Sequence, residues 1–147
     1  MAKLDLSPLS GIDGFVGAAL VDSDSGMALA KLDLSPLSSI DGFVGAALVD
    51  SDSGMALAKQ GGGVVDLDLA ASGNAEVVKS KRRVAASLKL GDTIEDILIS
   101  LEKQYHLIRP LERNDTLFLY VVLDRAKSNL ALSRHELKSF EQQLEFA

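Results

Sequence analysis

The chain has 147 residues, of which 47% are hydrophobic and 24% are charged, and its formal net charge at pH 7 is −6. This acidic balance argues against a nucleic-acid binder, and the sequence holds no apolar run of about 18 or more residues that would insert into a membrane. The absence of cysteine excludes disulfide and thiol chemistry and fits a cytoplasmic location. Acidic residues interrupt the N-terminal stretch, so we expect no secretory signal.

A direct repeat occupies the first part of the chain. Residues 31–58, the second copy, repeat residues 3–30, the first copy, with Ser39 in place of Gly11. Solenoid repeats need about three or more units and let their surface residues drift, whereas here even "DSDS" is copied. The pattern predicts a recent or artificial tandem duplication. We therefore expect an extra segment and one domain of common size: residues 1–30 and residues 31–147.

The start of the domain predicts a short helix followed by a β-hairpin. In "LSPLSSI", Ser35 is expected to cap a helical turn that Pro36 opens. The apolar residues 42–50, the turn "SDSG" and residues 55–59 then predict strand, turn and strand. This hairpin lies almost entirely within one copy.

A long helix is predicted next, from about residue 66 to residue 89. Glycines 61–63 break the preceding strand, Asp66 is the expected N-cap, and the helix should end at Gly91. Gly73 and Asn74 form a weak point within it. The apolar residues that recur at roughly helical spacing are Leu67, Ala70, Ala71, Val78, Ala85 and Leu88.

The second half of the chain changes to the period of β-strands. Residues 97–101, 105–111 and 116–124 predict three strands joined by short turns, which should form an antiparallel meander. From Ser128 onward, leucines at helical spacing predict a last helix. The predicted order is α-β-β-α-β-β-β-α, an α/β (layered α+β) fold.

Four stretches together resemble the Roadblock/LC7 family, in particular its short single-domain bacterial members. They are "IDGFVGAALVDSDSGMALA", "GNAEVVKSKRRV", "IEDILISLEKQYHLIRPL" and "LFLYVVLDRAKSNLALSRHEL". The resemblance implies a five-stranded antiparallel sheet with the long helix on one face, and homodimers that join their sheets edge to edge. It also implies a regulator or scaffold of Ras-like small GTPases, without a chemical active site in this chain.

A search for chemistry from the residues predicts no catalytic, cofactor-binding or metal-binding residue. "DSDSG" lacks the further acidic ligands of a calcium loop and reads as a turn. "GGGVVD" lacks the Lys and Ser/Thr of a phosphate-binding loop. Glu95 and Asp96 are expected to be solvated charges, and His106 and His135 to be structural, because no nucleophile or ligand set accompanies them.

The basic run "KSKRR" is the local exception in an acidic chain. A solvated face of the long helix, with Lys89 on the same outer face, is the simpler interpretation. The alternative is a surface that meets a partner's acidic groups or a nucleotide phosphate, as an arginine supplied in trans can. The predicted partner-binding residues are Lys79, Lys81, Arg82 and Arg83.

The repeat has a physical consequence, since either copy could supply the short helix and hairpin. Using the first copy forces a 28-residue loop, and closing it costs about 3 kcal/mol, so the second copy should occupy the fold by about 100 to 1. The spare apolar segment is then expected to pack on its own domain, on a second copy of the chain, or to swap into a neighbour. Oligomers larger than a dimer follow from this hypothesis.

Two functions stay open from the sequence. The first is a non-enzymatic regulator or scaffold of a Ras-like small GTPase that acts as a homodimer. The alternative is a small-ligand sensor or structural interaction module of the same fold. That alternative needs a pocket lined by groups such as Tyr105, His106 or Arg109.

Overall fold

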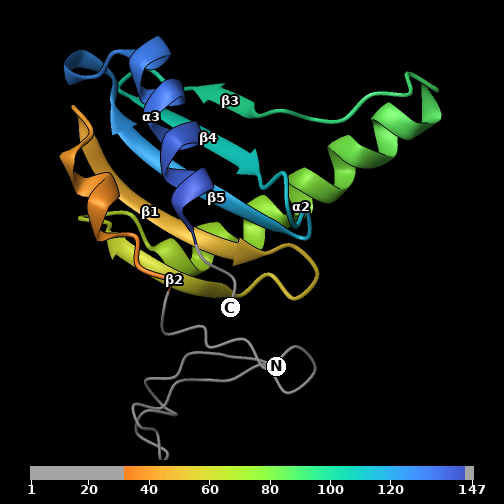
Figure 1. Cartoon of the computed structure of the whole chain (residues 1–147), viewed down its shortest axis with the longest axis horizontal. Coiled ribbons are helices and arrows are strands. Elements are labelled where there is room, and N and C mark those ends of the chain that lie inside the picture. Colours follow the sequence, from red (N-terminus) through yellow and green to blue (C-terminus); the bar gives the residue numbers. More distant parts are fainter. Residues whose placement is uncertain (1–31, 145–147) are drawn as a thin grey trace, which may run out of the picture.

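The computed structural model describes residues 32–144, and the expectations for the first copy lie outside these residues. A five-stranded antiparallel sheet in the order β2-β1-β5-β4-β3 forms the centre. Figure 1 shows it between two helical layers, with α3 in front of the sheet and α2 behind it. The strands are β1 (Phe43–Asp50), β2 (Ala56–Gly61), β3 (Ile97–Ser100), β4 (Gln104–Pro110) and β5 (Leu117–Asp124).

The helical elements complete the predicted order and confirm the fold class. They are the 3-10 turns η2 (Ser35–Ser39) and η3 (Arg125–Lys127) and the α-helices α2 (Leu67–Ser87) and α3 (Leu130–Gln143). The three strands after α2 form the expected meander, since β3 pairs with β4 and β4 with β5. The pairing of β1 with β5, which places the first strand in the middle of the sheet, had no local signal in the sequence.

Side chains alternate between the two faces of the sheet, so each face has its own core. On the α2 face, Ala71, Ala75 and Val78 of the helix pack on strand residues that include Phe118 and Tyr120. On the opposite face, η2 and α3 pack on a second set of strand residues. The buried side chains that η2, its flanking residues and α3 contribute are Leu32, Leu34, Leu37, Ile40, Leu137 and Phe140.

The entry into the domain differs from its prediction in one detail. The turn at η2 is a 3-10 helix, and its N-cap residue is Leu34, without a side-chain cap. Ser35 lies inside the turn, where its backbone N–H and its hydroxyl both donate to the carboxylate of Asp33. The prediction that Ser35 caps the turn is therefore wrong, because the preceding aspartate satisfies these donors instead.

The long helix α2 begins as predicted and ends earlier. The carboxylate of Asp66 accepts hydrogen bonds from the backbone N–H groups of Asp68 and Leu69, which confirms it as the N-cap. The helix stops at Ser87, and Lys89 takes a left-handed φ of 55°. The prediction that α2 ends at Gly91 was therefore wrong by a few residues, because the chain leaves the helical conformation before it reaches this glycine.

The last helix begins slightly later than Ser128. Asn129 is its N-cap and accepts a hydrogen bond from the backbone N–H of Leu132. Leu137 and Phe140 are buried on one side of α3, as their spacing predicted, and Leu144 is buried just after the helix ends. Within residues 32–144, neither helix is long and apolar enough to cross a bilayer.

Candidate dimer and partner-binding surface

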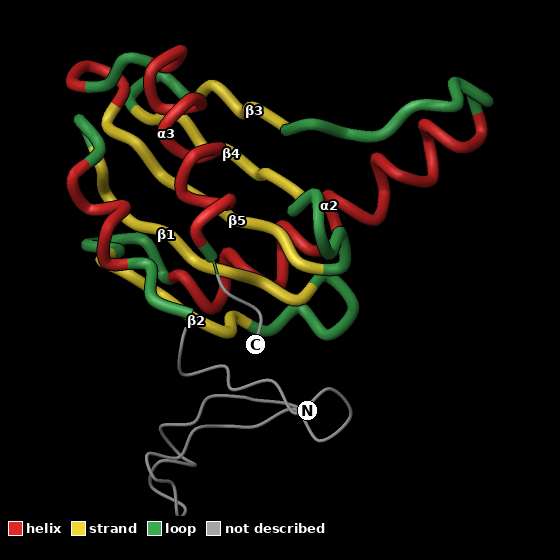
Figure 2. The backbone as a smooth tube through the Cα atoms, in the orientation of Figure 1, coloured by secondary structure: helices red, strands yellow, loops and turns green. Residues whose placement is uncertain are grey.

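The second half of α2 projects beyond the sheet and forms an arm with the connection that returns to β3. Figure 1 shows the helix leaving the sheet on the side where β4 and β5 are joined, and Figure 2 shows the loop that runs back to β3. We define the arm as residues 79–96. The predicted apolar face of the helix is confirmed only where the sheet lies beneath it, because Leu67, Ala71 and Val78 are buried.

The arm exposes large apolar side chains. Val84, Leu88 and Leu90 are 45%, 62% and 61% exposed. Val77 lies one heptad before Val84, so these side chains continue a stripe that starts against the α2-face core. Leu88, which the sequence placed on the core side, is exposed because the sheet does not extend beneath it. Exposed apolar side chains that cluster in this way are typical of a protein-binding surface.

The two edges of the described sheet differ in how well they are protected. At β2, Lys59 forms an ion pair with Asp68 of α2 at 2.9 Å, and three glycines follow. At β3, the residues are Ile97, Leu98, Ile99 and Ser100, without a charged side chain. Charges on an edge strand discourage pairing with another chain, whereas an apolar, uncharged edge favours it. The β3 edge is therefore the better candidate for sheet-to-sheet pairing.

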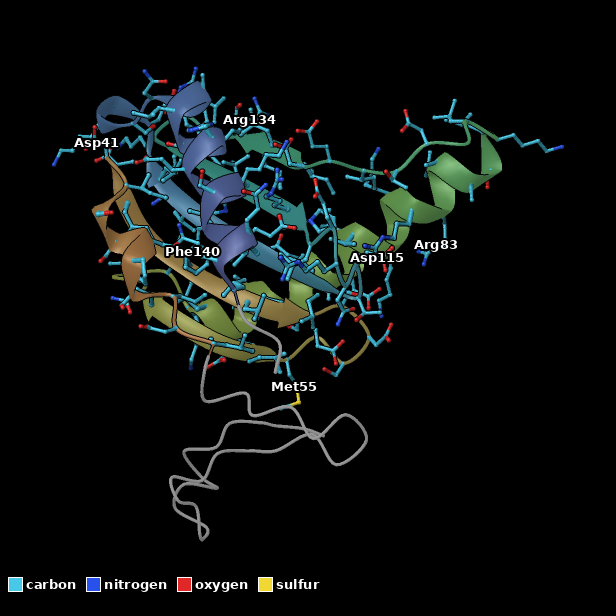
Figure 3. The ribbon with its side chains drawn as sticks, in the orientation of Figure 1. Asp41, Met55, Arg83, Asp115, Arg134 and Phe140 are labelled. Atoms are coloured by element: carbon cyan, nitrogen blue, oxygen red, sulfur yellow. The ribbon has the colours of Figure 1, made fainter. Side chains whose placement is uncertain are left out.

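A groove of about 610 Å³ lies between the arm and the end of the sheet. Arg82 and Lys89 line its arm side, while Glu112 and Asp115 belong to the opposite wall beside β4 and β5. The Arg82 side chain donates a hydrogen bond to the backbone carbonyl of Asp115 across this gap. Figure 3 shows Asp115 close to the helix and Arg83 farther out on the arm. The arm is thus attached to the sheet by a polar contact.

A small polar network lies on the α2 face near β3. The Tyr120 hydroxyl and His106 Nδ1 are 2.9 Å apart, and His106 Nε2 lies 2.9 Å from Oε1 of Gln104. The neutral imidazole with its proton on Nε2 satisfies both contacts, since it donates to Gln104 and accepts from Tyr120. Burial lowers the pKa of His106. It raises the pKa of Tyr120, against a smaller opposing effect of its hydrogen bond with Asn74.

The structural role expected for His106 agrees with this arrangement, and His135 is exposed on α3. Sequence reasoning missed the contact of His106 with Tyr120, because Tyr120 lies on another strand. The sequence could have indicated the contact with Gln104, because residues 104 and 106 are two positions apart on β4 and therefore lie on the same face of the sheet.

Comparison with known proteins identifies the fold. No family model and no curated protein matches the chain. A Roadblock/LC7 domain from Streptomyces avermitilis aligns with 74% of this chain and 88% of its own, at 15% identity and a TM-score of 0.65. Myxococcus xanthus MglB aligns with 78% of this chain and 89% of its own, at 20% identity and the same TM-score. The fold is that of Roadblock/LC7 domains.

A third structure supports the same conclusion. The gliding protein MglB from Thermus thermophilus aligns with 79% of this chain and 84% of its own, at 18% identity and a TM-score of 0.65. An MglB structure described as having a tetrameric arrangement gives the same values. The Roadblock/LC7 fold is therefore shared, although the sequences have diverged widely.

Within this Roadblock/LC7 fold, the four basic residues predicted to bind a partner do not form one patch. Lys79 pairs with Glu76 at 3.3 Å, and Arg82 turns toward the sheet. Lys81 and Arg83 are exposed and form no ion pair among residues 32–144. Two positions apart on a helix, they point to nearly opposite sides. Their common placement on an outer face with Lys89 was therefore wrong, and Lys89 lies after the end of α2.

The three residues expected to line a small-ligand pocket do not come together, although Arg109 is among the residues that line the groove. Tyr105 and Arg109 lie on the α3 face, whereas His106, one position away from Tyr105, lies on the α2 face. Neighbouring side chains of a strand cannot line one pocket, because successive side chains point to opposite faces of the sheet. Arg109 is moreover paired with Glu141 of α3 at 2.9 Å, with side-chain exposures of 5% and 7%.

Among the acidic candidates, Asp96 and Asp50 form contacts within the described residues. Asp96 was expected to be solvated, but it accepts two hydrogen bonds from the Arg134 guanidinium, at 2.9 and 3.2 Å. Glu95 is exposed, as expected. Asp50 accepts from the N–H of Asp52 at the start of the "DSDSG" turn. Residues 32–144 contain no cluster of three metal-ligating side chains.

Proposed function

We propose that this protein is a non-enzymatic regulator or scaffold of a Ras-like small GTPase and acts as a homodimer or higher homo-oligomer in the cytoplasm. The observation that carries the proposal is the open side of the α2 face, where an uncharged β3 edge lies next to an arm with exposed apolar side chains. The Roadblock/LC7 fold and the four motifs that resemble this family support the choice of partner.

The dimer follows from the chemistry of that open side. Two β3 strands that meet edge to edge would continue the hydrogen bonding of both sheets into one. The same approach would bring the arm of one chain against its partner and remove Val84 and Leu88 from water. A similar structure described as MglB with a tetrameric arrangement is consistent with homo-oligomers on this fold.

The GTPase would then meet the cations that remain available on the arm. Lys81 and Arg83 point to different sides of α2, so one can lie near the dimer seam while the other faces outward. Exposed cations steer an acidic partner surface and speed its association. We propose a non-enzymatic role because the surface exposes apolar side chains, an open strand edge and separated cations, which are typical of surfaces that bind proteins.

A pull-down from the source cell's lysate tests the proposal. The full chain serves as bait in parallel reactions with GDP and with a non-hydrolysable GTP analogue. We expect a small GTPase that prefers one nucleotide, and recovery that falls several-fold for Lys81→Glu or Arg83→Glu. Lys138→Glu is the matched control, because Lys138 is an exposed lysine on α3, across the sheet.

Two results contradict the proposal. If no GTPase is captured in either nucleotide state by folded bait, the GTPase partner is wrong. If metabolites rather than a GTPase raise the melting temperature of the purified chain, the small-ligand sensor replaces it, as linkage between ligand binding and folding requires.

A further inference from the structure

A second hollow, of about 660 Å³, lies at the end of the sheet away from the arm. We call it the end hollow and define it by its lining residues, which are Val44, 102–104 and 124–126. Val44 packs on the α2-face core, and Gln104 contacts His106 on the same face. The end hollow therefore opens on the face of the sheet that carries α2.

The arm and the end hollow lie at opposite ends of β3. The connection from the arm enters β3 at Ile97, whereas the turn that follows Ser100 forms one wall of the end hollow. Figure 1 shows α2 leaving the sheet at one end and the arrow of β3 pointing to the other end. Within one chain, the length of β3 therefore keeps the arm away from the end hollow.

A homodimer that pairs two β3 edges brings the arm of one chain to the end hollow of the other. Every strand pair within residues 32–144 is antiparallel, and two β3 strands that extend this pattern also run antiparallel. A two-fold axis perpendicular to the sheet relates such strands and keeps both α2 helices on one face. The start of one β3 then lies beside the end of the other, so each arm extends over its partner's end hollow.

Apolar side chains are present on both of these surfaces. Leu88 and Leu90 are exposed near the end of the arm. The end hollow has the side chains of Val44 and Ala126 in its lining. Its volume is within the range of sites that take a drug-sized molecule, so it has room for leucine side chains. Docking would remove these apolar groups from water.

Both surfaces also carry charges of either sign. Lys89 and Asp92 lie on the arm, and Lys103 and Glu102 lie in the turn that lines the end hollow. All four side chains are exposed, and none forms an ion pair among residues 32–144. Opposite charges can therefore meet across the contact, where they fix the register of two chains more than they add affinity.

We propose that the end hollow is the docking site for the end of the arm of a second copy of this chain. The inference rests on the proposed homodimer and adds a site that neither chain completes alone. Each dimer holds two such contacts, because the two-fold axis repeats the first one on the other side of the β3 seam.

Disulfide trapping tests this contact, since the chain has no cysteine of its own. The full chain with Val44→Cys is mixed with the full chain with Leu90→Cys under oxidising conditions, and we expect a covalent heterodimer. The control mixes Val44→Cys with Leu132→Cys, because Leu132 is an exposed leucine of α3, across the sheet. Sedimentation of the parent chain at the same concentrations shows whether a dimer is present.

The outcomes separate the docking site from the dimer itself. If the parent chain is a dimer and the Val44 and Leu90 variants do not cross-link, the docking site is wrong and the homodimer stands. Equal cross-linking by the control pair also overturns the docking site. A parent chain that is a monomer at every concentration contradicts both.

Filling the end hollow provides a second test without disulfides. Ala126→Arg should weaken the dimer about tenfold or more, because its side chain takes the space of the partner's arm. Ala126 is exposed, and its backbone N–H bonds to Asp124, so the domain should keep its melting temperature. Ala131→Arg is the matched control on α3, where an exposed alanine lies across the sheet. An Ala126→Arg dimer as tight as the parent overturns the proposal.

Discussion

The two faces of the sheet are closed to different degrees. On the α3 face, leucines of η2 and α3 cover the strands, and α3 is held by a buried ion pair between Arg109 and Glu141 and by a second pair between Arg134 and Asp96. Figure 3 shows Phe140 of α3 over the sheet and Arg134 at the other end of the helix. This face is completed by residues of the described chain.

The α2 face is covered over only part of its area. Small residues of α2, such as Ala71 and Ala75, allow the helix to approach the sheet closely in its first half, while its second half leaves the sheet as the arm. Near β3, this face includes the partly buried His106, which contacts the buried Tyr120, and the partly buried Ile97 and Ile99, which no helix residue buries completely. The difference indicates that one face stabilises the domain and the other is available to a second protein.

The largest expected effect concerns the buried ion pair of the closed face. Glu141→Gln should lower the free energy of unfolding by about 3–5 kcal/mol, because it leaves the buried Arg109 guanidinium without its counter-charge. The substitution keeps an oxygen that can accept the 2.6 Å hydrogen bond from the N–H of Glu112. Denaturant unfolding measures the loss.

A paired replacement separates this explanation from simple damage to packing. Arg109→Met together with Glu141→Met should recover most of the stability, since no buried charge remains. If the double variant is as unstable as the sum of the two single variants, the ion pair is not the cause and the comparison between the faces loses its basis.

The next largest effect concerns dimer formation, which should depend on the α2 face and not on the α3 face. Val84→Glu on the arm should weaken the homodimer about tenfold or more, because it places a charge in the apolar contact, while leaving the isolated domain folded. Leu132→Glu on α3 is the matched control, since Leu132 is 44% exposed and Val84 is 45% exposed. Sedimentation across a concentration series measures the mass. An equal loss for both variants would contradict an interface confined to the open face.

A smaller effect is expected from the second ion pair of the closed face. Asp96→Asn should cost up to about 1 kcal/mol, because the Arg134 side chain is 41% exposed and water screens the pair. The measurement is the same unfolding experiment as for Glu141→Gln. A loss as large as that of Glu141→Gln would show that α3 depends on its attachment to β3 more than on its buried pair.

Local signals predicted the elements of this fold well. Asp66 capped its helix, and the apolar strand predicted at residues 116–124 appeared at residues 117–124. Such features depend on neighbours within a few positions, and the sequence displays those neighbours directly. The resemblance to Roadblock/LC7 domains also agreed with the five antiparallel strands and with the long helix on one face of the sheet.

Features that depend on distant parts of the chain were not predictable in the same way. The sequence shows Arg82 as one of four neighbouring cations, but its carbonyl partner at Asp115 is 33 positions away. Leu88 fits the apolar spacing of α2, yet its exposure depends on where the sheet ends. The charge of a residue and the spacing of apolar residues indicate which helix or strand a side chain belongs to. The candidate site depends instead on how separate helices and strands pack against one another.

The smallest predicted effect depends on pH and on the polar end of the open face. Burial holds the pKa of His106 below its usual value of 6.5, so the unfolded chain binds the proton more readily. The stability from neutral His106 is therefore fully present above pH 6.5 and is lost as pH falls from 6.5 through the folded pKa.

Replacing the imidazole tests this sign. His106→Gln should remove part of the decline in stability below pH 6.5, whereas His135→Gln should not, because His135 is exposed. The measurement is denaturant unfolding of the parent and both variants at several pH values between about 7.5 and 5. If His106→Gln and the parent decline in parallel, desolvation of His106 does not affect folding. The region around His106 on the α2 face would then be as accessible to water as an outer surface. The difference in burial between the α2 face and the α3 face would be greater than the His106 contacts indicate.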